Sequence, residues 1–92
     1  MRVLVMHNPV SGRGRSGEVA DRVRDTLAAR GLVVERRHTP PRAGDVELRD
    51  ALRQVDAAVI VGGDGAMRRV APALIETGVP VYNLACGTEN LF

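Results

Sequence analysis

Three glycines and one carboxylate directly follow an apolar run: Val59–Val61 leads into Gly62-Gly63-Asp64-Gly65. Glycine adopts backbone torsions closed to other residues and lets a ligand approach main-chain amides closely. Because a helical pattern follows, these amides and a helix N-terminus would converge on one point, which favours an anion such as phosphate. A tight strand-to-helix turn is the simpler interpretation, but turn geometry alone needs fewer glycines. We therefore interpret this segment as a phosphate-binding turn.

Asp64 is the acidic residue of this turn. A carboxylate in a phosphate site is repulsive unless a metal ion or a proton intervenes. Its candidate roles are a supporting turn residue, a ligand for Mg²⁺ carried by a nucleotide, or an acceptor for a ribose or substrate hydroxyl. We favour the metal-linked or hydroxyl-linked role, which makes Asp64 the candidate catalytic residue.

Two other loops carry groups suited to phosphate. The first offers amide, hydroxyl and guanidinium groups from Asn8, Ser11, Gly12 and Arg13. Its alternative is an arginine-rich surface loop. The last, Gly87-Thr88-x-Asn90, offers a hydroxyl and an amide, although threonine after glycine is also a common helix cap.

The first loop also matches a dinucleotide-binding fingerprint, Gly12-x-Gly14-x-x-Gly17, with Glu35 near the distance expected for a ribose-binding acid. That fingerprint requires its first glycine immediately after the strand. Here residues 8–11 intervene, so the turn geometry disfavours a dehydrogenase-type site.

Histidine and cysteine give weaker signals. His7 and His38 have no metal-ligand spacing with any other residue, so we interpret both as structural. The lone Cys86 is interpreted as a small buried residue and not as a nucleophile. A single cysteine cannot form an internal disulfide, which fits a reducing compartment.

Apolar patterns indicate the elements that position these loops. The run 57–61 is typical of a strand buried on both faces. Strands are expected at 2–6, 32–37, 57–61 and 79–84, and helices at about 18–30, from Asp45 with Leu48, Leu52 and Val55 facing the core, and at 66–76. Gly31 and Gly78 should end helices, and Pro72 should kink or divide the last one.

Strands that alternate with helices predict a three-layer α/β fold: a mostly parallel four-stranded sheet, helices on both faces and right-handed crossovers. In this architecture all strand-to-helix loops open at one edge of the sheet. The three polar loops should therefore meet there.

Composition excludes several classes of protein and of catalytic chemistry. Ninety-two residues support one small domain, and no apolar run approaches the ~20 residues of a membrane span. With no signal-peptide pattern, a cytoplasmic location is expected. All 13 Lys and Arg positions are arginine, and without lysine a Walker P-loop and Schiff-base catalysis are excluded. A net charge of +2, with one Tyr and one Phe, argues against nucleic acid as a partner.

Three motifs together resemble a known family: Asn8-Pro9-x-Ser11-Gly12, Gly62-Gly63-Asp64-Gly65 and Gly87-Thr88-x-Asn90. In this order and spacing they resemble the N-terminal nucleotide-binding domain of the diacylglycerol kinase catalytic superfamily. That superfamily includes sphingosine, ceramide and bacterial lipid kinases, and it shares its fold and GGDG motif with NAD kinases. The resemblance covers nearly the whole chain.

The resemblance implies a site for ATP with Mg²⁺. The implied nucleotide-binding residues are Asn8, Pro9, Val10, Ser11, Gly12, Arg13, Thr39, Gly62, Gly63, Asp64, Gly65, Ala66, Arg68, Arg69, Gly87, Thr88 and Asn90. The family usually has threonine at the position of Ala66 and often Asn-Glu at those of Arg68 and Arg69. The two arginines either supply charge to the phosphates or face solvent.

The implied function is the ATP-binding lobe of a lipid kinase that transfers the γ-phosphate to a lipid hydroxyl, with the lipid acceptor bringing the full-length protein to a membrane surface. The alternatives are an NAD kinase-like enzyme, in which Asp64 contacts the hydroxyl, and a degenerate non-catalytic nucleotide-binding or interaction module. The family's C-terminal β-rich substrate domain is absent from residues 1–92, so we expect the isolated chain to be inactive. An exposed fourth strand and the apolar Leu91-Phe92 suggest that the chain binds a partner surface, for example a second copy.

Overall fold

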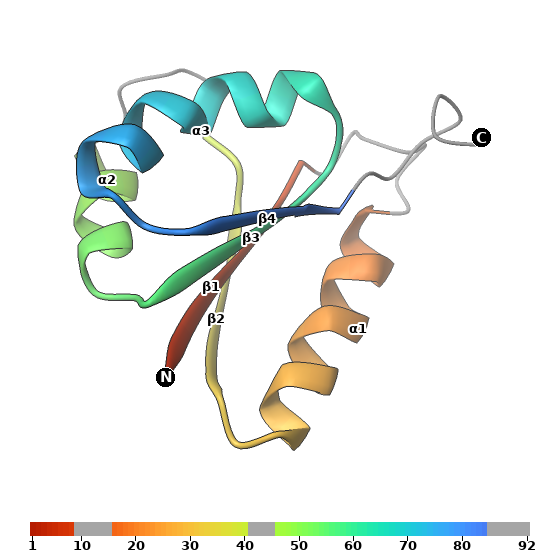
Figure 1. Cartoon of the computed structure of the whole chain (residues 1–92). Coiled ribbons are helices and arrows are strands. Elements are labelled where there is room, and N and C mark those ends of the chain that lie inside the picture. The colour runs from red at the N-terminus through yellow and green to blue at the C-terminus, as the bar shows by residue number, and fades with distance from the viewer. Residues whose placement is uncertain (9–15, 41–45, 85–92) are drawn as a thin grey trace.

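The computed structural model describes residues 1–8, 16–40 and 46–84. Within these residues strands and helices alternate along the chain (Figure 1). They are β1 (Arg2–His7), α1 (Ser16–Ala29), β2 (Val33–His38), α2 (Val46–Arg53), β3 (Ala57–Val61), α3 (Asp64–Thr77) and β4 (Val81–Leu84). The predicted order of elements is confirmed, with boundaries that move by a few residues.

The strands form one sheet in the order β2-β1-β3-β4, and each of its three neighbouring pairs is parallel. β1 and β3 occupy the centre, and all five residues of β3 are buried, as their apolar runs predict. Helix α1 covers one face, while α2 and α3 cover the other (Figure 1). The predicted three-layer α/β fold is therefore confirmed.

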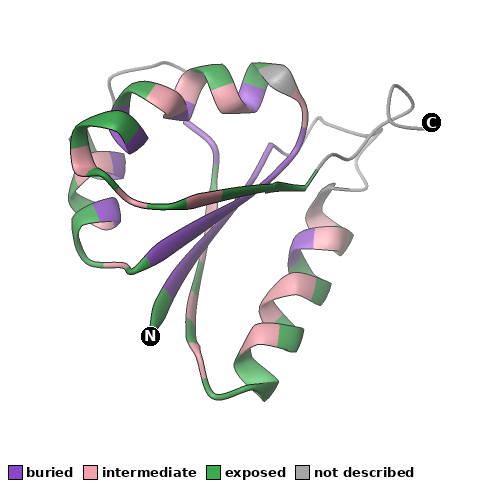
Figure 2. Ribbon diagram, viewed as in Figure 1, coloured by how far each residue is buried: buried purple, intermediate pink, exposed green. Residues whose placement is uncertain are grey.

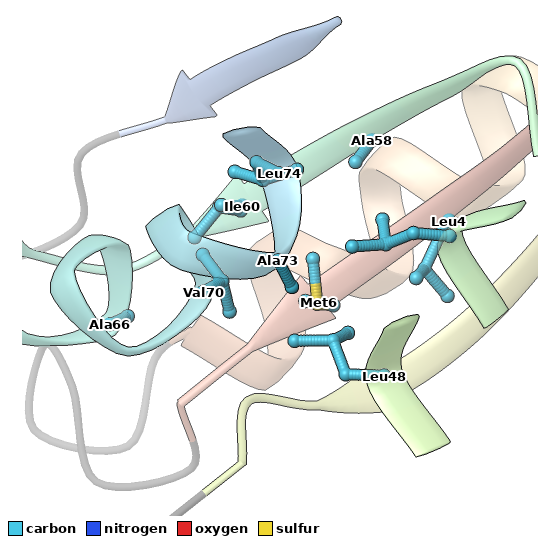
Figure 3. Close-up of a cluster of buried hydrophobic side chains, with 10 residues drawn as sticks. Leu4, Met6, Leu48, Ala58, Ile60, Ala66, Val70, Ala73 and Leu74 are labelled. Carbon is cyan, nitrogen blue, oxygen red and sulfur yellow. The ribbon is translucent and has the colours of Figure 1, made fainter. Parts of the chain in front are cut away.

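The face under α2 and α3 holds the larger cluster of buried side chains. β1 contributes Leu4 and Met6, and β3 contributes Ala58 and Ile60. Figure 3 shows these side chains packed beneath the two helices. The helices contribute Leu48, Leu52, Ala66, Val70, Ala73 and Leu74. Leu48 and Leu52 thus face the core as predicted, and Val55 packs against the same cluster.

The face under α1 holds a smaller cluster. Because side chains alternate along a strand, the valines at positions 3, 5, 59 and 61 point to this side. In residues 17–29 of α1, Ala20 alone is fully covered, and Val19, Val23 and Leu27 are partly buried. Figure 2 shows most of this helix as intermediate or exposed. A single helix over this face leaves more of it open.

Helix α3 differs from the prediction in two ways. It begins at Asp64 instead of Ala66, because Gly63 takes the N-cap position. It also continues as one helix through Pro72, so of the two predicted outcomes, a kink or a division, the division is wrong. Proline removes one helical hydrogen bond, but Pro72 is exposed while Val70 and Ala73 on either side are buried against the sheet. We infer that this packing outweighs the lost bond.

Glycine ends two helices as predicted. Gly31 follows α1 with φ of 87°, and Gly78 caps α3 with φ of 71°, donating its N–H to the Leu74 carbonyl at 2.9 Å. Asp45, the predicted cap of α2, lies outside the described residues. None of the helices in the described ranges is long and apolar enough to cross a bilayer.

Candidate functional site

The four strands end side by side. His7 pairs in register with His38 on one side and with Val61 on the other, and Val61 pairs with Leu84. Hydrogen bonds continue past the strands, from Thr39 N–H to the His7 carbonyl at 2.8 Å and from Gly62 N–H to the Leu84 carbonyl at 3.1 Å. The segments that follow all four strands therefore start at one edge of the sheet.

The strand order reverses at this edge. From β1 the chain crosses to β2 on one side, whereas β3 lies on the other side of β1. In open α/β sheets, ligands bind in a crevice outside the carboxyl ends of the strands where the order reverses in this way. A ligand crevice is therefore expected between the carboxyl ends of β1 and β3, at His7 and Val61.

The glycine turn leads directly into the N-terminus of α3. Gly63 is the N-cap, and it makes no side-chain capping hydrogen bond to the helix. The first N–H groups of a helix have no acceptor within it. Met67 N–H already bonds to the Gly63 carbonyl at 3.3 Å, so the amides of residues 64–66 are the ones that the helix leaves to a ligand. They carry the positive end of the helix dipole, which favours an anion.

Arg69 is brought to this N-terminus. A Cβ atom placed on Gly65 would lie 3.9 Å from a terminal guanidinium nitrogen of Arg69, so that side chain runs back along the first turn. Gly65 itself is exposed. A guanidinium beside open helix amides provides both charge and directed N–H donors for phosphate.

Two neighbours on α3 have different positions. The side chain of Ala66 is 1% exposed and packs in the cluster beneath α2 and α3 (Figure 3), so this residue faces the crevice through its backbone. Arg68 is exposed on the helix surface. Asp64 begins the helix, and its side chain lies outside the part of the chain that the structure describes.

Thr39 and Asn8 lie at the same edge, and both are buried. The Thr39 hydroxyl oxygen is buried without a hydrogen-bond partner among the described residues. A buried hydroxyl of this kind is costly unless something accepts or donates a hydrogen bond there. Only the family resemblance had predicted Thr39 as a nucleotide-binding residue. Its hydroxyl is therefore available to hydrogen-bond a ligand at the candidate site.

The remaining predicted residues lie outside the described residues: Pro9, Val10, Ser11, Gly12, Arg13, Gly87, Thr88 and Asn90. The strand ends that lead into their loops, His7 and Leu84, are both at this edge. Because β1 ends at His7, Gly12 does not follow the strand directly, and Gly17 lies in the first turn of α1. The observed boundaries therefore agree with our reason for disfavouring the dinucleotide fingerprint.

A polar cluster that the sequence did not predict lies beside β1 and β2. Arg36 contacts Asp21 of α1 and donates from a terminal nitrogen to Nδ1 of His7 at 3.0 Å. The rings of His7 and His38 meet edge to face, with 4.7 Å between their centres. Burial, then the charge of Arg36 and the neighbouring His38, lower the pKa of His7, and Asp21 opposes this shift.

The sequence did contain a signal for this cluster. Each histidine is the last residue of its strand, and the two strands are neighbours in a parallel sheet. Both histidines had been interpreted as structural. His7 is buried and hydrogen-bonded, as that interpretation requires, whereas His38 is exposed.

No group of three or more His, Cys, Asp or Glu side chains in residues 1–8, 16–40 and 46–84 is arranged to hold a metal ion. Mg²⁺ needs oxygen ligands and often receives several of them from substrate phosphates and water.

Comparison with known proteins agrees with this geometry. The sequence profile of the Diacylglycerol kinase catalytic domain matches residues 2–92. The NAD kinase of Heliobacterium modesticaldum (strain ATCC 51547 / Ice1) is 37% identical over 78 residues, a match that covers 76% of this chain and 26% of that protein. The chain thus spans about a quarter of the length of this relative. A family match over nearly every residue, on a parallel sheet with the glycine turn at its carboxyl edge, shows that the chain belongs to the diacylglycerol kinase catalytic domain family.

Proposed function

We propose that this chain is the nucleotide-binding lobe of an ATP-dependent kinase that phosphorylates the hydroxyl of a lipid. The observation that carries the proposal is the N-terminus of α3, which opens without a side-chain cap at the point where the strand order reverses. The family match supports a kinase of this kind. The diacylglycerol kinase description favours a lipid as acceptor.

The residues have distinct roles in this proposal. The amides of Asp64, Gly65 and Ala66 bind phosphate oxygens, and the guanidinium of Arg69 neutralises their charge. The buried Thr39 hydroxyl bonds to another part of the nucleotide. Fixed donors of this kind act mainly by positioning the phosphates and by stabilising the charge that develops during in-line transfer.

Mg²⁺ would enter with the nucleotide phosphates and neutralise charge between them. The carboxylate of Asp64 would then either bind this ion or accept a hydrogen bond from the acceptor hydroxyl. The location of the full-length protein, in the cytoplasm and at a membrane surface, follows from the lipid acceptor and is part of the proposal.

A second candidate is a kinase that phosphorylates a hydroxyl of NAD. The similarity to an NAD kinase favours it, because 37% identity extends over most of this chain. Both candidates use the same phosphate site and differ in the molecule that receives the phosphate. Nucleotide binding therefore cannot distinguish them, and the acceptor needs an experiment of its own.

The sharpest test of the phosphate site is Gly63→Asp. Gly63 has φ of −104° and ψ of −163°, an extended conformation that other residues also adopt, and aspartate is a favoured N-cap. The variant should fold as well as the original, but its carboxylate would occupy the helix amides and repel phosphate. We expect ATP affinity in calorimetric titration to fall at least tenfold, as loss of hydrogen bonds to a charged group of about 1.5–3 kcal/mol implies.

Gly63→Ala is the matched control, because it adds a Cβ atom without a carboxylate and should weaken ATP binding much less. Arg69→Gln should also weaken binding, and Arg68→Gln should have a smaller effect because Arg68 is exposed. Unchanged ATP affinity in Gly63→Asp would refute the proposed phosphate site. If the unmodified protein binds neither ATP, ADP nor NAD, a non-catalytic interaction module is the better description.

The acceptor is identified by phosphate transfer from radiolabelled ATP, with diacylglycerol in one reaction and NAD in another, using the full-length protein. Labelled lipid supports the first candidate, and labelled dinucleotide supports the second.

A further inference from the structure

The His7–Arg36 cluster borders a hollow that the proposed function does not use. The hollow has a volume of about 260 Å³, and His7, Arg36, Arg37 and His38 line it. It lies at the carboxyl ends of β1 and β2, one strand away from the crevice between β1 and β3. Two arginines and two histidines line it, and each arginine also pairs with one carboxylate outside the lining, Arg36 with Asp21 and Arg37 with Glu35.

The cluster is held in one arrangement before any ligand binds. A guanidinium group can only donate hydrogen bonds, so Nδ1 of His7 must be the acceptor of the bond from Arg36. The neutral ring then carries its proton on Nε2. A Cβ atom placed on Gly17 would lie 3.7 Å from Nε2, so this N–H is close to the first turn of α1. Asp21 contacts the far side of the same guanidinium and fixes its position.

Two polar atoms near this corner have unmet hydrogen bonds. Nε of Arg36 and the hydroxyl oxygen of Thr39 are both buried without a partner among the described residues. Thr39 is only 7% exposed, and its amide bonds directly to the His7 carbonyl. Buried polar groups of a native protein normally find a partner in protein, water or ligand.

Charge decides which ligand suits the hollow. Glu35, the acid expected to contact ribose if the dinucleotide fingerprint were real, does not line this hollow; it bonds to Arg37, and these two residues line a second hollow together with α2. In doubly wound sheets that bind dinucleotides, an acidic residue near the end of the second strand hydrogen-bonds a ribose hydroxyl. An arginine near the same position instead accommodates a phosphate on the ribose. Here this position has cationic and N–H donor groups.

We propose that the hollow of His7, Arg36, Arg37 and His38 is a phosphate subsite, separate from the one at the N-terminus of α3. Its ligand is a phosphate group, carried either on the ribose of a nucleotide or as free phosphate. That the phosphate can belong to a nucleotide bound in the neighbouring crevice rests on the proposed function. Arg37 and His38 contact the ligand, while Arg36 is mainly a positioning residue that holds His7.

The two histidines of this chain provide a direct readout, because both line the hollow. Imidazole ¹⁵N spectra should show His7 as the Nε2–H tautomer without ligand. Titration with inorganic phosphate should then shift the signals of both rings with saturation. Arg37→Gln should weaken this binding about tenfold, the loss of one charge-assisted interaction. Arg53→Gln is the control, since Arg53 is an exposed arginine of α2 that pairs with Asp50.

The source of the phosphate is tested with 5′-AMP and adenosine 2′,5′-bisphosphate. If the phosphate is carried on ribose, the bisphosphate should bind about tenfold more tightly than 5′-AMP, and Arg37→Gln should abolish the difference. If inorganic phosphate binds but the two nucleotides have equal affinities, the ligand is free phosphate.

Failure of this proposal differs from failure of the proposed function. ADP that shifts the amide signals of Gly63 and Gly65, with no saturable response of either imidazole to inorganic phosphate or the bisphosphate, would overturn the subsite and leave the function intact. Imidazole shifts with phosphate that Arg37→Gln weakens, without any response of the α3 amides to ADP, would support the subsite and count against the function. An equal response to phosphate in Arg37→Gln and the unmodified protein would also overturn the subsite.

Discussion

The two faces of the sheet differ most at the carboxyl ends of the strands. Under α2 and α3 the buried cluster remains apolar as far as Ala66 in the first turn of α3. Under α1 the side chains change along the strands, from Val3 and Val5 to His7 in β1 and from Val34 to Arg36 in β2. One face supports the glycine turn and α3 with an apolar cluster, whereas the other brings charged side chains to the edge of the sheet. The apolar and the charged interactions at this edge are thus divided between the faces.

The largest test of this division compares neighbours in β3. Ile60 and Val61 are both fully buried, but they point to opposite faces. Ile60→Ala should lower the free energy of unfolding by about 2–5 kcal/mol because it leaves a cavity in the larger cluster. Val61→Ala should cost less, since it removes one fewer methylene and the cluster under α1 is more open. Urea unfolding measures both, and a greater loss at Val61 would contradict the comparison.

The next test removes charge from the face under α1. The Arg36 side chain is 21% exposed and bonds to both Asp21 and His7. Arg36→Gln should lower the free energy of unfolding by about 1.5–3 kcal/mol, the usual range for hydrogen bonds to charged groups. Arg24→Gln breaks ion pairs to the same Asp21 and to Asp25, but at 42% exposure it should cost about 1 kcal/mol or less. If thermal unfolding shows equal losses of unfolding free energy in the two variants, burial does not strengthen the interactions of Arg36.

The stability cost of replacing a glycine that ends a helix should not depend on which face of the sheet the helix covers. Gly31 after α1 and Gly78 after α3 both have positive φ, and a Cβ atom at either would have nothing within 4 Å. Alanine at each position should therefore cost about 1 kcal/mol, from backbone conformation alone. A much larger loss at one of the two in denaturant unfolding would show that its surroundings, and not φ, decide the cost.

The smallest expected effect is a pH dependence that belongs to the face under α1. Burial, Arg36 and His38 hold the pKa of His7 below its ordinary value of 6.5, and Asp21 opposes them. The unfolded chain therefore binds a proton more readily than the native one, so this contribution to stability is complete above pH 6.5 and is lost as pH falls below it. Unfolding measured between about pH 7.5 and 5.5 should show this slope, and His7→Gln should reduce it. His38→Gln tests the assignment, because the slope should largely remain.

Much of the fold could be predicted because it depends on local patterns. The run 57–61 is apolar throughout, and it is a strand buried on both faces. Gly31 and Gly78 end helices because the chain has a left-handed φ at both positions. The glycine turn at the carboxyl end of β3 was predicted from the same kind of signal. A division of α3 at Pro72 was wrongly allowed for, because the cost of proline is local while the packing of α3 that offsets it is not.

The contacts of Arg36 in the His7–Arg36 cluster could not be predicted by these means, although the two strand-end histidines were a signal for the cluster itself. Its contacts join Asp21 of α1, Arg36 of β2 and the end of β1, and they depend on the register of two strands and on the placement of one helix. The side-chain direction of Ala66 was also beyond the sequence, because it required knowing that α3 begins at Asp64. Residue types suggested phosphate, but only the three-dimensional structure shows which groups are neighbours.

Tyr82 has a practical consequence for experiments. It is the sole tyrosine in a chain that contains no tryptophan, and it lies 65% exposed on β4, away from both buried clusters. Ultraviolet emission excited in this chain therefore comes from one position at the border of the sheet. A change in that emission reports events along β4, such as strand pairing with another molecule, and is a poor monitor of the interior.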